Sequence, residues 1–477
     1  MSAPFKQQAS LDAWMRRQYA LSAAKMMSAI SRVDLVKERR GFGRQVRPVK
    51  GSILASPVIA AYDPDPDYFF HWLRDSAVII DALRLLIESG EIARSDGLAH
   101  FSDFLGFSLT LCGLDGRSFL AGAGDYRGKV EPHFAQFLRP ETELLAISGD
   151  DILGEPRFDP DGSIDILKWS RPQHDGPALR VLAVARFCRS VGPGPDILKQ
   201  AEQLILRDLG FTFARWRAPS FDIWEEELGR HYYTQLIQCE ALREGGLWLL
   251  SRGAIESASA YLDAAQEIAT GLDDFWSAPH GFLRSRIAAP DSGPQKELDI
   301  ATVLAVIHAG RNAGPHSICD SRLIATLGRL EALFAKAYAI NAARPGADAP
   351  AMGRYDGDRY YSGGAYFFST LGAAEFYFKA AQAVAKGLLD DASQWARLGL
   401  ETEHDNNHLF DALMRRGDQF MATVAAYTPE SGDLSEQFDQ TDGAQTSAKN
   451  LAWSHAAFIS AYASRTKAIR AAKGGSP

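Results

Sequence analysis

The sequence predicts an all-α protein, in which about a dozen helices pair into a closed ring of helical hairpins. Amphipathic stretches with helical periodicity recur along most of the chain, and few strand signals stand between them. Long loops rich in glycine, proline and aromatic residues alternate with shorter connections. Such alternation is expected when the long loops gather at one end of a helical ring and build a site there.

The elements follow from periodicity and capping signals. A first helix is expected from Leu11 to Ile30, with Ser10 as its N-cap. An irregular segment rich in glycine, proline and valine follows at 33–67, and it contains a strand-like piece from Gly51 to Val58. Further helices are predicted at 72–89, 98–112, 175–191, 196–215, 231–251, 254–272, 297–310, 319–341, 362–385, 388–398, 405–425 and 446–464. The long loops fall at 113–174, 216–230, 273–296, 342–361 and 426–445.

Length and composition favour one large domain. The 477 residues exceed the usual size of a domain with one core, but no linker rich in proline, serine or threonine separates a second domain. Hydrophobic residues make up 46% of the chain and charged residues 23%, as in ordinary globular proteins. We therefore expect a single domain over 1–477, with the segment 33–67 joining the first helix to the rest.

Charge and hydropathy exclude several classes of partner. The formal net charge is −8, and no basic run is long enough to follow a phosphate backbone, so nucleic acid is not an expected partner. The N-terminus from Met1 to Gln8 has no apolar stretch typical of a signal peptide, which favours the cytoplasm. Asp81 and Arg84 interrupt the apolar run from Ala77 to Ile87, so no membrane span is expected.

Neither a metal nor an organic cofactor is expected. Histidine ligands at metal spacing, paired Cys-x-x-Cys motifs, a phosphate loop and a dinucleotide fingerprint are all missing from the sequence. A Gly-x-Ser-x-Gly nucleophile motif is missing as well. The four cysteines stand singly in apolar helical patterns, which favours buried free thiols: Cys112, Cys188, Cys239 and Cys319. Paired carboxylates are the chemistry that remains.

Two acidic stretches carry those carboxylates. In Ser220–Glu227, Trp224 is followed by three glutamates, and a second stretch runs from Asp433 to Asp439. Hydrolysis of a glycosidic bond with inversion needs one protonated and one ionised carboxyl group. Apolar cover and like charge around Glu225 favour the protonated form, and donors around Glu436 favour the ionised form. We expect the two glutamates to face each other across a pocket and split a glycosidic bond. The alternative for Asp222-x-x-Glu225 is a helix capping box.

Three loop segments combine aromatic residues with fixed charge. The first, 67–76, places Tyr68 and Trp72 beside the pair Arg74 and Asp75. Aromatic faces next to an Arg–Asp pair suit a sugar, whose C–H faces stack on rings while its hydroxyls bind charged groups. The alternative is a helix start with an exposed ion pair. The second segment comprises 154–158 and 169–177; the third comprises 353–356 and 360–367, where tyrosines and arginine line a pocket or only shape tight turns.

The order of these segments resembles the inverting glucoamylase family, glycoside hydrolase family 15. The matching segments span most of the chain: Tyr68–Ser76, Gly154–Phe158, Trp169–Leu179, Phe221–Glu226, Gly353–Phe367 and Leu434–Trp453, with Leu11–Trp14 similar to the family's first helix. The resemblance implies an (α/α)6 barrel and a single-domain, bacterial-type member without a starch-binding domain. It also implies an exo-acting α-glucosidase that releases β-D-glucose from the non-reducing ends of α-1,4-linked gluco-oligosaccharides.

The resemblance also implies roles for individual residues. Glu225 matches the family's general acid and Glu436 its general base. Arg74 and Asp75 match the pair that holds the 4- and 6-hydroxyls of the terminal glucose. The other substrate-binding positions implied by the resemblance or by the loop segments are Tyr68, Trp72, Trp169, Trp224, Glu226, Arg354, Tyr360, Tyr366, Gln437 and Trp453.

The chain departs from the family's pattern in ways that bear on its substrate. Phe221 stands where the best-known fungal members have tyrosine, and Ala365-Tyr366 stands where they have a proline-tryptophan pair. The stretch from Gly113 to Leu153 is longer and divergent. These changes fall around the outer sugar subsites, so they leave the linkage and chain-length preference open. Because no starch-binding domain is expected, short soluble oligosaccharides rather than granular starch are the expected substrates. A specialist for α-1,6 linkages, a trehalase and a sugar-binding relative without catalysis remain as alternatives.

Overall fold

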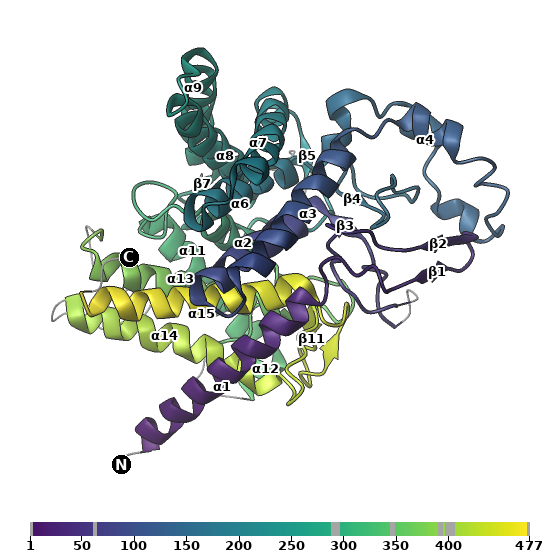
Figure 1. Ribbon diagram of the computed structural model, residues 1–477. Helices are drawn as coiled ribbons and strands as arrows, with labels where there is room; N and C mark the ends of the chain where they lie inside the picture. Colours follow the sequence, from purple (N-terminus) through teal and green to yellow (C-terminus); the bar gives the residue numbers. More distant parts are fainter. Residues whose placement is uncertain are drawn as a thin grey trace. The chain divides into compact units, whose positions relative to one another are not determined.

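The computed structural model describes residues 3–60, 64–287, 296–343, 349–389, 395 and 406–474, and helices dominate it (Figure 1). The chain divides into two compact units. Unit 1 comprises Met1–Met26, His231–Leu236 and Ile268–Pro477. Unit 2 comprises Met27–Arg230 and Ile237–Glu267. The prediction of a single domain stays a prediction, and the two units are described in turn.

Unit 2 is built around a set of packed helices. Helix α2 (Leu73–Ser89) packs on α6 (Asp175–Val191), α6 on α7 (Pro195–Arg215), and α7 also contacts α3 (Arg94–Cys112). The apolar stripe of α2, which includes Ile79, Ile80, Leu83 and Leu86, is fully buried. Gly90 ends α2 in the left-handed conformation, which glycine adopts without steric cost.

Short strands and turns connect these helices and hold the loops in place. Strands β1 (Lys37–Arg39) and β2 (Arg44–Val46) pair with each other, as do β3 (His71–Trp72) and β4 (Arg157–Phe158). Strand β5 (Ser220–Phe221) pairs with β6 (Leu228–His231). Along the chain, four short helices follow α3 and precede α6: α4 (Gly116–Gly122), η1 (Phe134–Phe137), α5 (Glu141–Leu145) and η2 (Gly149–Gly154).

Unit 1 is centred on α13 (Phe367–Ala385), which packs against α14 (Asn406–Tyr427), α15 (Ala452–Ala472) and α10 (Ala301–Ala309). Most residues of α13 are buried, so it forms the core of this unit. A small antiparallel sheet in this unit has the strand order β10 (Ala365–Tyr366), β11 (Gln437–Phe438), β12 (Gln445–Thr446), and β10 leads directly into α13. The remaining elements of this unit are η3 (Leu272–Phe275), β7 (Trp276–Ser277), β8 (Phe282–Leu283), β9 (Arg286–Ile287), α11 (Ser321–Ala337) and α12 (Ala339–Ala342).

Three further helices have residues near or across the unit boundaries: α1 (Ala3–Met27), α8 (Tyr232–Leu250) and α9 (Ile255–Gly271). Most predicted helices agree with the structure to within a few residues; the helix at 175–191 agrees at both ends. Among the helices that the structure describes, none is long and apolar enough to cross a membrane.

Several local expectations were wrong. Ser10 does not cap the first helix, because α1 already begins at Ala3; Pro4 suits a first helical turn, and no helix breaker follows it. The piece 51–58 forms no strand and contributes only the isolated bridge Ile30–Ile53. The helix expected at 319–341 breaks at Tyr338, whose backbone is extended.

Helices α13 and α15 start later than expected. Residues 365–366 and 445–446 form the strands β10 and β12, which pair with β11 instead of joining the helices. The expected helix at 388–398 lies mostly outside the described residues. All four cysteines are free thiols, but only Cys112 and Cys239 are fully buried; Cys188 and Cys319 are partly exposed.

Candidate active site

Glu225 sits in a tight turn between β5 and β6, not at a helix start. The register pairs Ser220 with Gly229 and Phe221 with Leu228. Oδ1 of Asp222 accepts hydrogen bonds from the backbone N–H groups of Glu226 at 2.7 Å and Glu227 at 2.8 Å. The capping-box alternative is therefore wrong, because Asp222 organises a turn from which no helix begins.

The backbone of Glu225 itself is strained. Its φ of 65° lies in the left-handed region, which residues other than glycine rarely occupy. Such a conformation costs on the order of 1–3 kcal/mol and concentrates at functional sites. The Ser170 hydroxyl donates to the Glu225 carbonyl and helps to hold this conformation. The turn thereby fixes the direction in which the carboxylate points.

Donors surround the Glu225 carboxylate. Trp72 Nε1 donates to Oε1 at 2.9 Å, and Arg74 Nη2 donates to the same oxygen at 3.0 Å. Trp169 Nε1 donates to the other oxygen, Oε2. One guanidinium and two indole donors therefore bind both oxygens of the carboxylate and fix its orientation. The sequence analysis expected Trp224 to cover Glu225. In the structure, the indoles of Trp72 and Trp169 lie against its carboxylate, and each donates its N–H to it.

Arg74 is held from two sides at the start of α2. Its Nη1 donates to Gln173 Oε1 at 3.0 Å and to Asp175 Oδ2 at 2.9 Å. This arrangement needs the first turns of α2 and α6 to approach closely, and Gly176 permits it. A Cβ at Gly176 would lie 2.7 Å from Leu73 Cβ, which is closer than real contacts. Glycine is therefore required at position 176, where the first turns of α2 and α6 meet.

Asp75 is the group whose protonation the site alters most clearly. Burial raises the pKa of Asp75 to about 7, and the negative charges of Glu225 and Asp175 add to this effect while Arg74 opposes it. Asp75 Oδ2 lies 4.0 Å from Arg74 Nε. A carboxyl group that titrates near neutrality can donate a hydrogen bond below that pH and only accept above it.

Two buried polar atoms of this cluster have no hydrogen-bond partner among the described residues. They are Nε of Arg74 and Oδ1 of Asp175, whose residues are 4% and 1% exposed. An unsatisfied buried polar atom costs about 1–3 kcal/mol, so native proteins rarely leave one without a reason. The donor and the acceptor are suited to ligand hydroxyl groups, which can accept from one and donate to the other.

Glu436 lies in unit 1 immediately before β11. Its N–H donates to Ala448 O at 2.8 Å, and its carbonyl accepts from Phe367 N at 3.2 Å, so the sheet fixes its backbone. The Ser447 hydroxyl donates to Glu436 Oε2. Ser447 has a φ of 61°, a second strained residue beside a candidate catalytic carboxylate. The hydroxyl donor thereby fixes the direction in which the Glu436 carboxylate points.

The neighbours of Glu436 form a connected polar network. Gln437 Nε2 donates to the hydroxyl oxygen of Tyr366 at 2.6 Å and to the carbonyl of Tyr360 at 3.0 Å. Tyr366 in turn donates to Asp358 Oδ2 at 3.2 Å, and Asp358 forms a buried bidentate pair with Arg354. Burial raises the pKa of Tyr366 well above its usual value, so its phenol stays neutral and remains a donor.

Comparison with known proteins identifies the family. The profile of "Glycosyl hydrolases family 15" matches residues 142–463. This chain belongs to glycosyl hydrolases family 15. It is therefore a glycoside hydrolase, which confirms the family and the enzyme class expected from the motifs.

Relatives of this family 15 chain extend over nearly its whole length. It is 26% identical to the protein named "Probable glucoamylase" of Schizosaccharomyces pombe, over 95% of this chain and 92% of that protein. It is 29% identical to "Glucoamylase-1" of Schizophyllum commune, over 89% of this chain and 70% of that protein.

Solved glucoamylase structures share its fold. The Hormoconis resinae enzyme superposes with a TM-score of 0.76 at 26% identity, covering 95% of this chain and 74% of that one. The Saccharomycopsis fibuligera enzyme gives a TM-score of 0.77 at 21% identity and covers 96% of both chains. These likenesses and the helix-rich secondary structure confirm the predicted all-α class, the (α/α)6 barrel.

The predicted site residues of the family 15 chain fall into two groups, one in each unit. In unit 2, hydrogen bonds join Trp72, Arg74 and Trp169 to Glu225, and Tyr68 packs on Trp72 with ring centroids 5.3 Å apart. Trp224 and Glu226 share the turn of Glu225, and Glu226 is exposed. In unit 1, the network around Glu436 contains Arg354, Tyr360, Tyr366 and Gln437, and Trp453 stacks on Phe368 at 4.6 Å.

Sequence reasoning assigned no individual role to several residues that organise these groups, although the first three lie in the segments 154–158 and 169–177 that it singled out: Arg157, Gln173, Asp175, Asp358 and Ser447. Asp358 pairs with Arg354 four residues earlier, but both lie in a loop, where this spacing predicts no pairing. Asp175 opens α6 within the singled-out segment 169–177. Ser447 carried no signal, because its partner is reached only through the pairing of β11 with β12.

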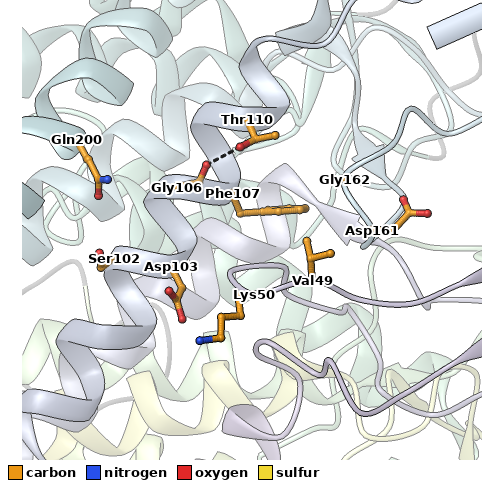
Figure 2. A pocket seen from close by; sticks show the side chains of 10 residues that line it. All are labelled: Val49, Lys50, Ser102, Asp103, Gly106, Phe107, Thr110, Asp161, Gly162 and Gln200. Carbon is orange, nitrogen blue, oxygen red and sulfur yellow. Dashed lines mark hydrogen bonds between the residues drawn. The ribbon is translucent and has the colours of Figure 1, made fainter. Parts of the chain in front are cut away.

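A separate hollow of about 440 Å³ lies between α3, α7 and the loops at 49–50 and 161–162 (Figure 2). Phe107 forms part of its wall, and the ring of Phe107 packs against His71 at 4.9 Å. Lys50 and Asp103 bring opposite charges to its rim, and Gln200 adds an amide. The predicted site residues are not among those that line it, so this hollow is not the candidate active site.

Proposed function

We propose that this protein is an inverting, exo-acting α-glucosidase in which Glu225 is the general acid and Glu436 the general base. Glu225 gives a proton to the leaving glycosidic oxygen, and Glu436 takes a proton from the attacking water. The substrates are short α-1,4-linked gluco-oligosaccharides, and the first product is β-D-glucose. The observation that carries the proposal is the strained Glu225 turn, whose carboxylate is bound by Trp72, Arg74 and Trp169.

The cluster at the start of α2 supports sugar binding. Arg74 Nε and Asp175 Oδ1 are buried polar atoms without hydrogen-bond partners among the described residues, and Asp75 lies beside them. Hydroxyl groups of a terminal glucose are able to satisfy all three. Rings of Tyr68 and Trp169 are partly exposed next to this polar cluster and offer faces on which a sugar stacks.

The protonation of Glu225 sets the expected pH behaviour. A general acid must carry its proton at the start of the reaction, so we expect kcat to fall at high pH, where Glu225 loses its proton. A general base must be ionised to accept a proton from water, so we expect kcat to fall at low pH, where Glu436 gains one. The Ser447 hydroxyl orients the Glu436 carboxylate for this role. Together the two groups give a bell-shaped profile.

The names of the relatives favour this substrate class. The proteins from Schizosaccharomyces pombe and Schizophyllum commune are both called glucoamylases. Phe221 and Ala365-Tyr366, which depart from the best-known fungal pattern, make linkage preference the part most worth measuring. The competing enzyme candidates are an α-1,6-specific hydrolase and a trehalase.

A substrate panel tests the proposal. We expect maltose and maltotriose to be hydrolysed with higher kcat/KM than isomaltose or trehalose, and proton NMR to show β-glucose first. A preference for isomaltose or trehalose would replace the linkage assignment. No glucose release from any of the four would favour a sugar-binding relative.

Variants test the catalytic roles. Glu225→Gln and Glu436→Gln each keep the size of the side chain but remove the acid or the base, so kcat should fall by roughly 10³-fold or more while the thermal unfolding midpoint changes little. Glu226→Gln removes an exposed carboxylate of the same turn that is expected to bind substrate rather than to transfer a proton, so it should raise KM more than it lowers kcat. Near-normal turnover in either catalytic variant would refute the assignment.

A further inference from the structure

Behind the two tryptophans that bind Glu225 lies a stack of rings and guanidinium groups. The Arg157 guanidinium carbon is 3.5 Å from the centroid of the Trp169 ring and 5.1 Å from that of Trp72. On Phe70 the same group lies 4.1 Å from the ring centroid, and the Arg39 guanidinium lies 3.7 Å from it. Both guanidinium groups therefore contact the Phe70 ring.

Strand pairing fixes one end of this stack. Trp72 and Arg157 are directly opposed in the register of β3 and β4. Next to this pair, Leu73 N–H donates a backbone hydrogen bond to Pro156 O at 2.9 Å, which also holds the two strands together. Arg157 is only 2% exposed, so its charge acts in a poorly solvated environment where cation–π contacts are strongest.

A buried ion-pair network anchors the Arg157 guanidinium. Its Nε donates to Asp165 Oδ2 at 2.8 Å, and Arg171 Nη2 binds the same oxygen at 3.0 Å. Burial alone would raise the pKa of Asp165, but the two arginines outweigh it and lower the pKa to about 2. Asp165 is therefore ionised throughout the working pH range and keeps Arg157 in one orientation.

We propose that Arg157 is a positioning residue for Glu225, acting through the rings of Trp169 and Trp72 whose N–H groups bind the two carboxylate oxygens. The inference rests on the proposed role of Glu225 as the acid. The positive charge over the ring faces fixes the ring planes and strengthens the indole N–H groups as donors. Arg39, which lies in the segment 33–67, adds a second guanidinium group against the Phe70 ring.

Removing the guanidinium should affect chemistry more than binding. In Arg157→Gln the tryptophan rings lose the group that fixes their planes, and a small misplacement of an acid costs up to about 100-fold in rate. We expect kcat on maltotriose to fall about 10- to 100-fold, with KM changed less than about 3-fold. Arg157→Lys keeps the charge and should recover part of kcat.

A double-mutant cycle separates this role from a general loss of packing. Trp169→Phe removes the N–H donor while it keeps an aromatic ring. If Arg157 acts through Trp169, the kcat effects of Arg157→Gln and Trp169→Phe are not additive, and the double variant loses little more than the worse single variant. Additive effects would overturn the proposal.

Arg180→Gln is the matched control for stability. Arg180 is also fully buried in unit 2 and forms a bidentate pair with Asp208, but it has no contact with the Glu225 cluster among the described interactions. The Arg180→Gln variant should lower the thermal unfolding midpoint at least as much as Arg157→Gln does. At temperatures below that midpoint, it should leave kcat and its pH profile unchanged. Equal kcat loss in both variants would refute the positioning role.

The outcomes also distinguish this inference from the proposed function. If Glu225→Gln abolishes turnover while Arg157→Gln leaves kcat and its pH profile unchanged, only the role of Arg157 fails. If Glu225→Gln turns over normally, both the proposed function and this inference fail.

Discussion

Arg74 Nη2 donates to Glu225 Oε1 at 3.0 Å and thereby joins two residues 151 positions apart in the sequence. The same guanidinium binds Asp175 through Nη1 at 2.9 Å. One buried cation thus links the start of α2, the start of α6 and the turn between β5 and β6. The geometry of the candidate acid consequently depends on the packing of two helices as well as on its own turn.

Arg74→Lys should therefore impair the enzyme severely although it conserves charge. A lysine ammonium is a single point donor and cannot bridge Gln173, Asp175 and Glu225 as the guanidinium does. We expect kcat/KM on maltotriose to fall at least about 100-fold. Arg84→Lys on the same helix is the control, since the ion pairs that Arg84 makes within the described part of the chain are with Asp81 and Glu88 on a partly exposed face, and this site should tolerate the change. Similar losses in both variants would contradict a specific role for Arg74.

Asp75 should produce an ionisation near pH 7 in the kcat/KM profile of the free enzyme, because its pKa is raised to about 7. Asp75→Asn should remove that inflection and leave the others. The same shift affects stability. The folded protein keeps this proton up to about pH 7, whereas an unfolded chain releases it near pH 3.9, so stability falls as pH rises between these values. Asp75→Asn should thus stabilise the fold more at pH 8 than at pH 4; an equal effect at both would contradict the shifted pKa.

Ser447→Gly separates the hydroxyl from the backbone conformation. Glycine adopts the observed φ of 61° without strain, so the unfolding midpoint should not fall. The hydrogen bond to Glu436 Oε2 is nevertheless lost, and a misoriented base should lower kcat about 10-fold. Steady-state kinetics measures the expected fall in kcat, and calorimetry measures the unfolding midpoint. Unchanged kcat would mean that Ser447 does not serve the base.

Gly176→Ala tests the helix contact that places Arg74 beside Asp175. The new Cβ would meet Leu73 Cβ at 2.7 Å, so α2 and α6 must separate slightly at the site. We expect kcat/KM to fall about 10-fold or more and stability to decrease by about 1–3 kcal/mol. Gly210→Ala in α7 is the control, since a Cβ there meets no atom within 4 Å, and it should raise stability by about 0.5–1 kcal/mol with activity intact. Intact activity in Gly176→Ala would show that this close approach is dispensable.

Much of the fold was predictable from local signals. The helix at 175–191 agrees at both ends because periodicity, an acidic first turn and a following glycine all mark it. Boundaries next to short strands were predicted poorly: 365–366 and 445–446 pair with β11, a partner distant in sequence or joined to it by a tight turn. Local propensity cannot indicate such pairing.

The sequence by itself determined the helical class, the two acidic stretches and the motifs that match family 15. It also indicated Arg74 and Asp75 as a charged pair beside aromatic residues. Only the tertiary structure decided that Glu225 occupies a left-handed turn organised by Asp222, with Arg74, Trp72 and Trp169 on its carboxylate. The physical reason is that helices arise from contacts three or four residues apart, which periodicity records. The state of a buried carboxylate depends instead on donors that packing brings from distant segments, and no local pattern encodes them.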